Sequence, residues 1–222
     1  YYCKSLTKVE FPPNSNLQTI EKSAFSFTNI KEICFPSSVL IICKNAFYFC
    51  AKLTKVEFPP NSNLQTIGEA AFSCSEIKEI FIPSTVSKIC KDAFYDCAKL
   101  TKVAFPPNSN LQIIEEAAFI HSRIKEIFIP STVLIICKDA FYDCTKLTKI
   151  EIPPNSNLQT IGKSAFSISN IKGIFIPSTV TKICENAFSN CSLQIIEFSE
   201  EIKLKSFPFS AFQDYQITII IW

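Results

Sequence analysis

The sequence predicts a β-rich solenoid in which short parallel strands, one from each repeat unit, stack into a sheet. Three observations lead to this fold class: a repeat that covers nearly the whole chain, alternating apolar and polar residues at the start of each unit, and nine Ala-Phe dipeptides at regular spacing. A repeat unit of this size cannot bury its apolar face alone, whereas stacked units share one continuous core.

The repeat has a period of 47 residues that divides into two related units of about 23 or 24 residues. Type A units begin with motifs such as Leu6-Thr-Lys-Val-Glu-Phe-Pro-Pro and contain a Pro-Pro-Asn-Ser-Asn turn. Type B units begin with motifs such as Ile30-Lys-Glu-Ile-Cys-Phe-Pro and have a shorter Pro-Ser-Ser or Pro-Ser-Thr turn. We expect a single solenoid over residues 1–222 with ten stacked parallel strands, which begin near residues 6, 30, 53, 77, 100, 124, 147, 171, 193 and 217.

Each unit supplies two limbs of one coil. On the first limb, Leu6, Val9 and Phe11 point inward as a half-buried strand requires, and Pro12 ends the strand because it has no N–H to donate. On the opposite limb, apolar residues turn inward again, and we expect short strand or 3-10 segments there. The Ala-Phe pair then closes the coil.

The phenylalanines of the Ala-Phe pairs occupy one repeat position, so stacking should place them in a single column through the core. We call them the phenylalanine column: Phe25, Phe47, Phe72, Phe94, Phe119, Phe141, Phe166, Phe188 and Phe212.

The 11 cysteines also fall mostly into two columns, one through Cys43 and one through Cys50. Members of one column are two coils apart, about 10 Å, which is beyond the roughly 7 Å Cα separation that a disulfide spans. We therefore interpret the Cys50 column, which alternates with Ser or Thr, as small buried residues. The spacing does not exclude a disulfide from Cys74 to a neighbouring coil. It also does not exclude disulfides within one coil, such as Cys43 with Cys50. Stacked columns do not converge on one point, so we expect no metal site.

The composition argues against several functional classes. Lys and Arg number 22 against 20 Asp and Glu, which is unlike the basic excess of nucleic-acid binders. Only 3 glycines exclude most phosphate-binding Gly-rich loops, and the single histidine, His121, leaves little room for histidine-based catalysis. We expect no enzyme activity, no cofactor and no nucleic-acid partner from this chain.

The outward residues of the strands form the candidate site. Lys and Glu alternate along one column from Lys8 to Lys149, which predicts cross-strand pairs of opposite charge. On every second coil a phenylalanine also points outward, and exposed aromatic residues are typical anchors of protein interfaces. The predicted protein-binding face comprises Phe81, Phe128, Phe175, Lys78, Lys125, Lys172, Glu79 and Glu126.

Two alternatives apply to this face. The stems of Lys78 and Lys125 would cover the rings, or another segment of the full protein would do so. A second candidate column lies in the loops after the Ala-Phe pairs, where loop packing explains the residues equally well: Tyr1, Tyr48, Tyr95 and Tyr142.

The repeat resembles a known family. The segment IKEIFIPSTVSKICKDAFYDC, residues 77–97, and the segment 171–191 look like the BspA-like (treponemal-type) leucine-rich repeat. Family members often carry Ile-Gly before the Ala-Phe turn; Gly68 and Gly162 keep it, whereas cysteine replaces it in type B units. The resemblance implies a β-rich leucine-rich-repeat solenoid of surface or secreted proteins that adhere to host or microbial proteins. It implies no catalytic residues and no cofactor.

We therefore predict a non-enzymatic protein-binding scaffold that forms part of a cell-surface or secreted adhesin. An intracellular or structural interaction scaffold is the alternative, since many free thiols suit a reducing compartment and a cytoplasmic location stays open. A third hypothesis places a catalytic domain outside this chain. The absence of Met and of polar capping units predicts a piece of a longer array, whose exposed strand edges, such as 217–222, invite self-association.

Overall fold

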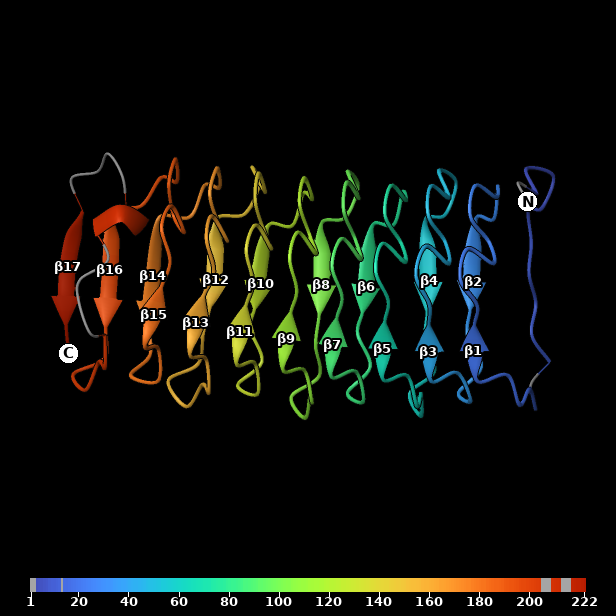
Figure 1. Cartoon of the computed structure of the whole chain (residues 1–222), viewed down its shortest axis with the longest axis horizontal. Coiled ribbons are helices and arrows are strands. Elements are labelled where there is room, and N and C mark those ends of the chain that lie inside the picture. The colour runs from blue at the N-terminus through green and yellow to red at the C-terminus, as the bar shows by residue number, and fades with distance from the viewer. Residues whose placement is uncertain (1–2, 13, 205–208, 213–216) are drawn as a thin grey trace.

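A computed structural model describes residues 3–12, 14–204, 209–212 and 217–222. The coils stack along one axis, and the two termini lie at opposite ends of the stack (Figure 1). The described residues contain strands β1 to β17 and one 3-10 helix, η1 (Phe209–Ala211). All strand pairs are parallel, as the repeat predicts.

The first limb of each coil is a strand of three or four residues. In most of these strands the central residue is buried and its two neighbours face outward, as in the exposed–buried–exposed pattern of Glu79, Ile80 and Phe81. The first-limb strands are β2 (Glu32–Cys34), β4 (Lys55–Glu57), β6 (Glu79–Phe81), β8 (Lys102–Ala104), β10 (Glu126–Phe128), β12 (Lys149–Glu151), β14 (Gly173–Ile176), β16 (Ile195–Phe198) and β17 (Thr218–Ile221).

First-limb strands pair in small groups instead of forming one sheet. Each type A strand pairs with the type B strand before it, which gives the sheets β2-β4, β6-β8, β10-β12 and β14-β16-β17. Up to β14, a type A strand and the type B strand after it are joined more weakly, for example by the 3.4 Å bond from Lys78 N to Thr54 O just before β6 and β4. The first limb therefore alternates between fully bonded and weakly bonded steps from β2 to β14, whereas the last type A strand, β16, pairs fully with both β14 and β17.

The predicted strand near residue 6 is wrong: residues 3–12 contain no strand, so the first limb has nine strands where we expected ten. The pairing rule supplies the reason. A type A segment bonds to the type B strand that precedes it, and the described residues contain no such strand before Leu6. The bond from Asn29 N to Leu6 O, at 3.0 Å, still links this segment to the next coil.

The second limb forms one continuous eight-stranded sheet, which favours short strands over the 3-10 alternative. Within the described parts of the chain, the 3-10 helix η1 occurs only at the last Ala-Phe pair. The second-limb strands have two residues each: β1 (Thr19–Ile20), β3 (Ile41–Ile42), β5 (Thr66–Ile67), β7 (Lys88–Ile89), β9 (Ile113–Ile114), β11 (Ile135–Ile136), β13 (Thr160–Ile161) and β15 (Lys182–Ile183).

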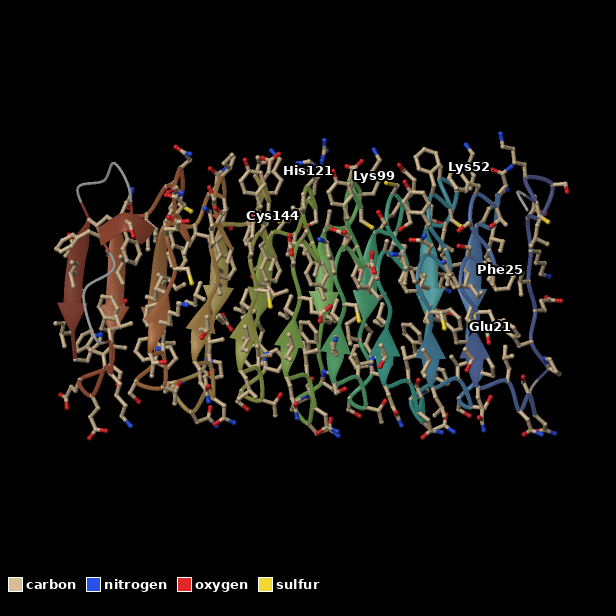
Figure 2. All side chains as sticks on the ribbon, in the orientation of Figure 1. Glu21, Phe25, Lys52, Lys99, His121 and Cys144 are labelled. Carbon is tan, nitrogen blue, oxygen red and sulfur yellow. The ribbon has the colours of Figure 1, made fainter. Side chains whose placement is uncertain are left out.

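The phenylalanine column is confirmed and runs the length of the core between the two limbs. Consecutive rings stack with centroids 5.1 to 5.5 Å apart and ring planes within 19° of parallel. Phe25, in the first of these coils, is partly buried and packs against the core (Figure 2). Backbone bonds such as Phe72 N to Ala93 O, at 2.8 Å, hold successive Ala-Phe turns at this spacing.

The turns around the Ala-Phe pairs use left-handed backbone conformations without glycine. In each regular turn two residues four apart have positive φ, for example Asp92 (55°) and Asp96 (52°). Asn and Asp tolerate this conformation because their side chains bond locally, whereas alanine and branched residues do not gain that compensation. Ala70 (50°), Ala117 (58°) and Ile168 (58°) therefore store local strain.

All eleven cysteines, each within the described residues, are unpaired. The interpretation of the Cys50 column as small buried residues is confirmed for Cys50, Cys97, Cys144 and Cys191, whereas Cys3, at the same repeat position in the first coil, is exposed. Cys97 Sγ lies 3.3 Å from Ser75 Oγ and donates to the carbonyl oxygen of Phe72 at 3.2 Å. Burial raises the pKa of Cys97 and of Cys144 to about 12. The equivalent contacts in other coils join Thr28 to Cys50, Ser122 to Cys144 and Ser169 to Cys191.

Candidate functional site

The predicted binding residues lie on the outward side of the first limb, which we call the strand face. Phe81 ends β6 and Phe128 ends β10, and their side chains are 53% and 44% exposed. Phe175 occupies the equivalent position in β14 but is half-buried beside Glu197 of β16, its partner in the ladder. Two of the three predicted aromatic residues are thus available to a partner.

Phe81 is the more exposed of the pair because of its neighbour across the ladder. Its partner in β8 is Ala104, whereas Phe128 and Phe175 each have a glutamate partner, Glu151 and Glu197. Other type A coils also carry glutamate at the position of Ala104. A methyl group therefore stands between two outward phenylalanines, and we call this place the Ala104 gap.

The surface is hollowed on both sides of the Ala104 gap. One groove of about 610 Å³ is lined by Lys78, Glu79, Phe81, Lys102 and Ala104 together with residues of β4. A smaller one of about 280 Å³ lies toward Phe128, and Lys102 and Ala104 line it as well. A third hollow of about 740 Å³ extends from Phe81 over the prolines that end the strands. Ala104 thus lies where two of the grooves meet.

The lysines of the predicted face leave the aromatic rings accessible. Lys78, Lys125 and Lys172 are themselves exposed, and Phe81 and Phe128 remain about half exposed beside them. Within the described residues, none of the three lysines forms an ion pair. Glu79 and Glu126 of the same face are also exposed and also make no ion pair with described residues, so the face offers apolar rings beside unpaired charges of both signs.

The predicted register of the Lys/Glu column is confirmed, but its predicted ion pairs are not formed. Glu79 lies opposite Lys102 and Glu126 opposite Lys149 in the ladder. The contacts instead join each lysine to the glutamate two residues later on its own strand, as in Lys55 to Glu57 at 2.7 Å and in the pairs Lys8–Glu10 and Lys149–Glu151. Since residues two apart on a strand share a face, both groups point outward.

Lys102 differs from the other lysines of its column. Lys8, Lys55 and Lys149 each contact a glutamate two residues later, whereas residue 104 is alanine. The hydrogen bond that Lys55 donates to the Glu57 carboxylate raises the pKa of Lys55. Lys102 makes no ion pair with any described residue, so its charge is free to meet a partner at the Ala104 gap.

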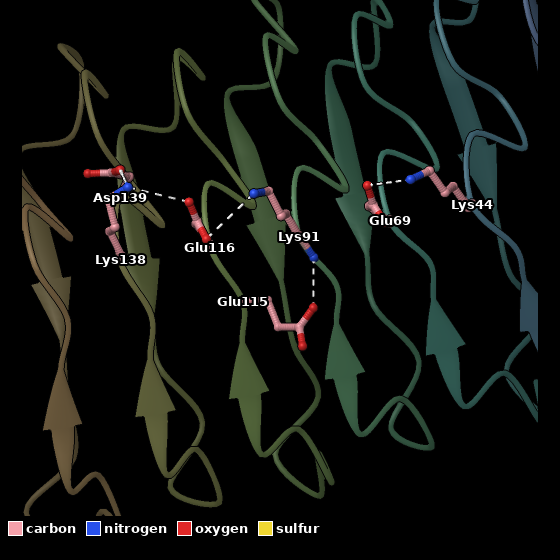
Figure 3. Close-up of polar contacts among 7 residues, drawn as sticks. All are labelled: Lys44, Glu69, Lys91, Glu115, Glu116, Lys138 and Asp139. Carbon is pink, nitrogen blue, oxygen red and sulfur yellow. Dashed lines mark hydrogen bonds and ion pairs between the residues drawn. The ribbon is translucent and has the colours of Figure 1, made fainter.

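Charged residues beside the second limb behave differently, because they pair from coil to coil (Figure 3). Lys44 Nζ lies 2.7 Å from Glu69 of the next coil, and Glu116 lies between Lys91 at 3.6 Å and Lys138 at 3.4 Å. Glu115 accepts a 2.9 Å bond from the backbone N–H of Lys91. These charges hold neighbouring coils together and are not available in the way that Lys102 is.

Six basic side chains on the strands and loops of neighbouring coils make no ion pair within the described part of the chain. They come from four successive coils and are all exposed: Lys78, Lys99, Lys102, Arg123, Lys125 and Lys146.

Sequence reasoning missed Lys102 and Ala104 as site residues. The signal was present, because Ala104 interrupts the glutamates of the type A coils. The tyrosine column has mixed roles: Tyr48 packs on Phe27 at 5.3 Å and Tyr95 lies 5.7 Å from His121, while Tyr1 falls outside the described residues. His121 lies in the loop at the edge of the stack (Figure 2), with Nε2 3.5 Å from Asp143.

The described residues form neither a metal site nor a membrane-spanning helix. Among the described residues, no group of three or more His, Cys, Asp or Glu side chains is arranged to hold a metal ion. Over the same residues, no helix has the length and hydrophobicity needed to cross a membrane.

Solved structures of low sequence identity share this fold. A leucine-rich repeat protein from Bacteroides ovatus matches with a TM-score of 0.60 and 23% identity, over 92% of this chain and 66% of that protein. The pneumococcal vaccine antigen PcpA matches with a TM-score of 0.50 and 17% identity, over 92% of this chain and 79% of the antigen. This chain thus spans just under two thirds of the B. ovatus protein. No match was found among curated protein sequences.

The family comparison agrees with the stacked parallel strands and the repeat length. The sequence pattern of the BspA type leucine rich repeat region matches residues 1–111 and 87–219, with six copies. These two ranges together cover nearly the whole chain. The chain therefore belongs to the BspA-type leucine-rich repeat family.

Proposed function

We propose that this solenoid is a non-enzymatic binding scaffold that holds a protein partner on its strand face, as part of a cell-surface or secreted adhesin for host or microbial proteins. The observation that carries the proposal is the Ala104 gap, where two half-exposed phenylalanines flank grooves and an unpaired lysine. Aromatic residues in such settings supply much of the binding energy at protein interfaces. An open repeat surface suits an extended partner and excludes water poorly, which disfavours catalysis.

Support for the surface location comes from relatives. One structural neighbour is named as a pneumococcal vaccine antigen, and the family resemblance implies adhesion to host or microbial proteins. The proposed partner is therefore an extracellular protein, of the host or of another microbe.

The test immobilises the wild-type solenoid and measures which extracellular proteins it retains, followed by a titration of each retained protein. Phe81→Ser with Phe128→Ser should weaken binding at least tenfold while the thermal midpoint stays within about 2 °C, because both rings are half exposed. Phe49→Ser is the matched control, since Phe49 is 47% exposed but lies in a loop away from the strand face. Equal binding by all three proteins would overturn the proposal.

A second candidate function is an intracellular interaction scaffold, and the unpaired state of all eleven cysteines favours it. Disulfides form in oxidising compartments, so an extracellular protein with eleven free thiols is unusual. Counting thiols in protein isolated from its source separates the two: eleven reactive thiols after unfolding support the intracellular scaffold, and a lower count supports the extracellular one.

A further inference from the structure

We propose that the solenoid hinges at three steps of its first limb, so that the strand face opens and closes between rigid blocks of two coils. The blocks are the paired strands β2-β4, β6-β8 and β10-β12, and the hinge steps are β4–β6, β8–β10 and β12–β14. The hinge follows from the bonding between coils. It does not depend on the proposed function, although it changes the shape of the candidate site.

Backbone bonds at equivalent positions differ between the two kinds of step. Inside a block, the N–H of Thr101 bonds to Lys78 O at 2.8 Å, and the Thr101 hydroxyl donates to the same carbonyl at 3.2 Å. A ladder then joins β6 to β8. At the hinge steps no ladder joins the described strands. The N–H of Lys78 is 3.4 Å from Thr54 O, and that of Lys125 is 3.3 Å from Thr101 O. Both bonds are longer than the usual 2.9 Å or so and therefore weaker.

The other two edges of each coil are bonded alike at every step, so they provide the pivot. The second limb is one continuous sheet from β1 to β15. Along the Ala-Phe turns, the bond from Phe72 N to Ala93 O crosses a hinge step, and the bond from Phe94 N to Ala118 O crosses a step inside a block. Both bonds are 2.8 Å long. Movement between blocks is therefore confined to the first limb.

The grooves of the strand face are a second observation that points to the same steps. The groove of about 610 Å³ includes Val56 of β4 and Ile80 of β6 in its lining, and the groove of about 280 Å³ includes Val103 of β8 and Ile127 of β10. All four residues are buried members of the core. The surface is thus open down to core side chains on both sides of two hinge steps, as expected where strands are weakly joined.

The hinge separates the two exposed phenylalanines of the candidate site. Phe81 belongs to the block β6-β8 and Phe128 to the block β10-β12, so the β8–β10 step lies between them. Opening of this step widens the Ala104 gap on the side of Phe128, while Phe81 and Ala104 move together. On the proposed function, a partner that touches both rings selects one width of the gap.

Native-state hydrogen exchange tests the hinge. NMR follows single amides of the full chain at urea concentrations below the unfolding transition. The amides of Lys78 and Lys125 bond across hinge steps, whereas those of Thr101 and Thr148 occupy the same coil position and bond inside blocks. After correction for intrinsic rates, we expect the two lysine amides to exchange at least about tenfold faster. Urea should accelerate their exchange less steeply than global unfolding does, because the open hinge exposes only part of the core.

The amides of Phe72 and Phe94 are the control for the pivot, and we expect equal protection of the two. Equal protection of the lysine and threonine amides would overturn the hinge. Lysine exchange that does not respond to urea would also overturn it, since that result indicates a local fluctuation of exposed groups. Faster exchange of Phe72 than of Phe94 would show that whole coils separate, which contradicts a pivot at the Ala-Phe turns.

One variant tests whether weak bonding is the cause. Lys125→Thr places at a hinge step the hydroxyl that Thr101 and Thr148 use inside blocks. This bond should slow exchange of the residue 125 amide about fivefold, the effect of one hydrogen bond. The Lys78 amide, at a different hinge step, should keep its wild-type rate and is the internal control. An unchanged rate at residue 125 would contradict the proposed origin of the hinge.

Discussion

Equivalent repeat positions keep their residue type in the interior columns of this solenoid but vary on its strand face. In the interior, every Ala-Phe turn contributes the same ring at the same spacing, and each buried cysteine meets a serine or threonine of the preceding coil. On the strand face, the position of Phe81 is cysteine in one coil, alanine in another and glutamate in several more. Stacking fixes the interior, because each buried group touches its copies above and below, whereas solvent imposes no such restraint outside.

This difference is the reason that the proposed binding function is placed on the strand face. The buried repeat positions keep the same residue types because neighbouring coils pack against them. On the strand face, residue 104 is alanine where the other type A coils have glutamate, so the surface differs locally at this coil. The same comparison gives a scale of expected effects, since changes to the interior should lower stability and changes to the strand face should alter binding.

The largest effect is expected from removal of one interior ring. Phe119 is fully buried and stacks on Phe94 and Phe141 at 5.2 Å, so Phe119→Ala should lower the free energy of unfolding by about 3 to 5 kcal/mol. Phe81→Ala, on the strand face, should cost less than about 1 kcal/mol because the ring is half exposed already. Urea unfolding of both variants measures the difference, and similar costs would contradict the distinction between interior and face.

The buried thiols predict a loss of stability at alkaline pH. Burial raises the pKa of Cys97 and Cys144 to about 12, above the value of about 8.5 for an unfolded thiol. The unfolded chain therefore loses these protons first, and the stabilisation present below about pH 8.5 should fall by roughly 1.4 kcal/mol per thiol for each pH unit between the two values.

Urea unfolding from pH 8 to 11 measures this loss. A variant with Cys97→Ser and Cys144→Ser controls for other titrating groups, because serine stands at the same position in type A coils such as Ser75 and Ser122. The wild-type protein should lose stability more steeply than the variant, and parallel pH profiles would show that these thiols are not buried in solution.

The backbone of the preceding coil lies close to Gly162, so substitution of this glycine should cause an intermediate loss of stability. A Cβ atom added there would lie 2.5 Å from the carbonyl carbon of Cys137, on the preceding coil. Gly162→Ala should therefore lower the free energy of unfolding by about 1 to 3 kcal/mol, as overpacking does elsewhere. Gly173→Ala is the control, since its nearest added contact would be 3.7 Å away. Thermal unfolding compares the two, and an equal change in both would contradict this account of Gly162.

The smallest effect should be a gain in stability. Ala70 has a φ of 50°, and the equivalent residue in type B coils is Asn or Asp. Ala70→Asn places a residue that tolerates the left-handed conformation there and should add up to about 1 kcal/mol to the free energy of unfolding. A loss of stability in urea unfolding would mean that strain at this turn is unimportant.

The fold could largely be predicted from the sequence, because the repeat imposes stacking on every buried position. The phenylalanine column, the Cys50 column and the parallel register all follow from residues such as Phe72 and Cys97 that recur at fixed spacing. The pairwise bonding of first-limb strands did not follow, since it depends on how each turn directs the chain after the strand. The missing strand near Leu6 is a consequence of that bonding.

The candidate site was predicted only in part. The outward position of Phe81 and Phe128 follows from strand alternation. The partial burial of Phe175 does not follow from its ladder partner, since Phe128 also faces a glutamate and stays exposed. The ion pairs depend on side-chain conformations that periodicity does not specify. Ala104 could have been recognised from the sequence as a break in the glutamates of the type A coils. The grooves beside Ala104 could not have been recognised from the sequence, because their shape depends on the conformations of several neighbouring side chains from different strands.

The most direct test of the central claim, that the Ala104 gap is a binding site, is the affinity of Ala104→Glu for a partner protein retained by the wild-type solenoid. Glutamate is native at this position in other type A coils, as at Glu57 and Glu151, so the variant should unfold at the wild-type temperature. We predict that its affinity falls at least tenfold while Ala51→Glu, the same change at an exposed loop position, binds normally. Wild-type affinity in a fully folded Ala104→Glu protein would contradict the account.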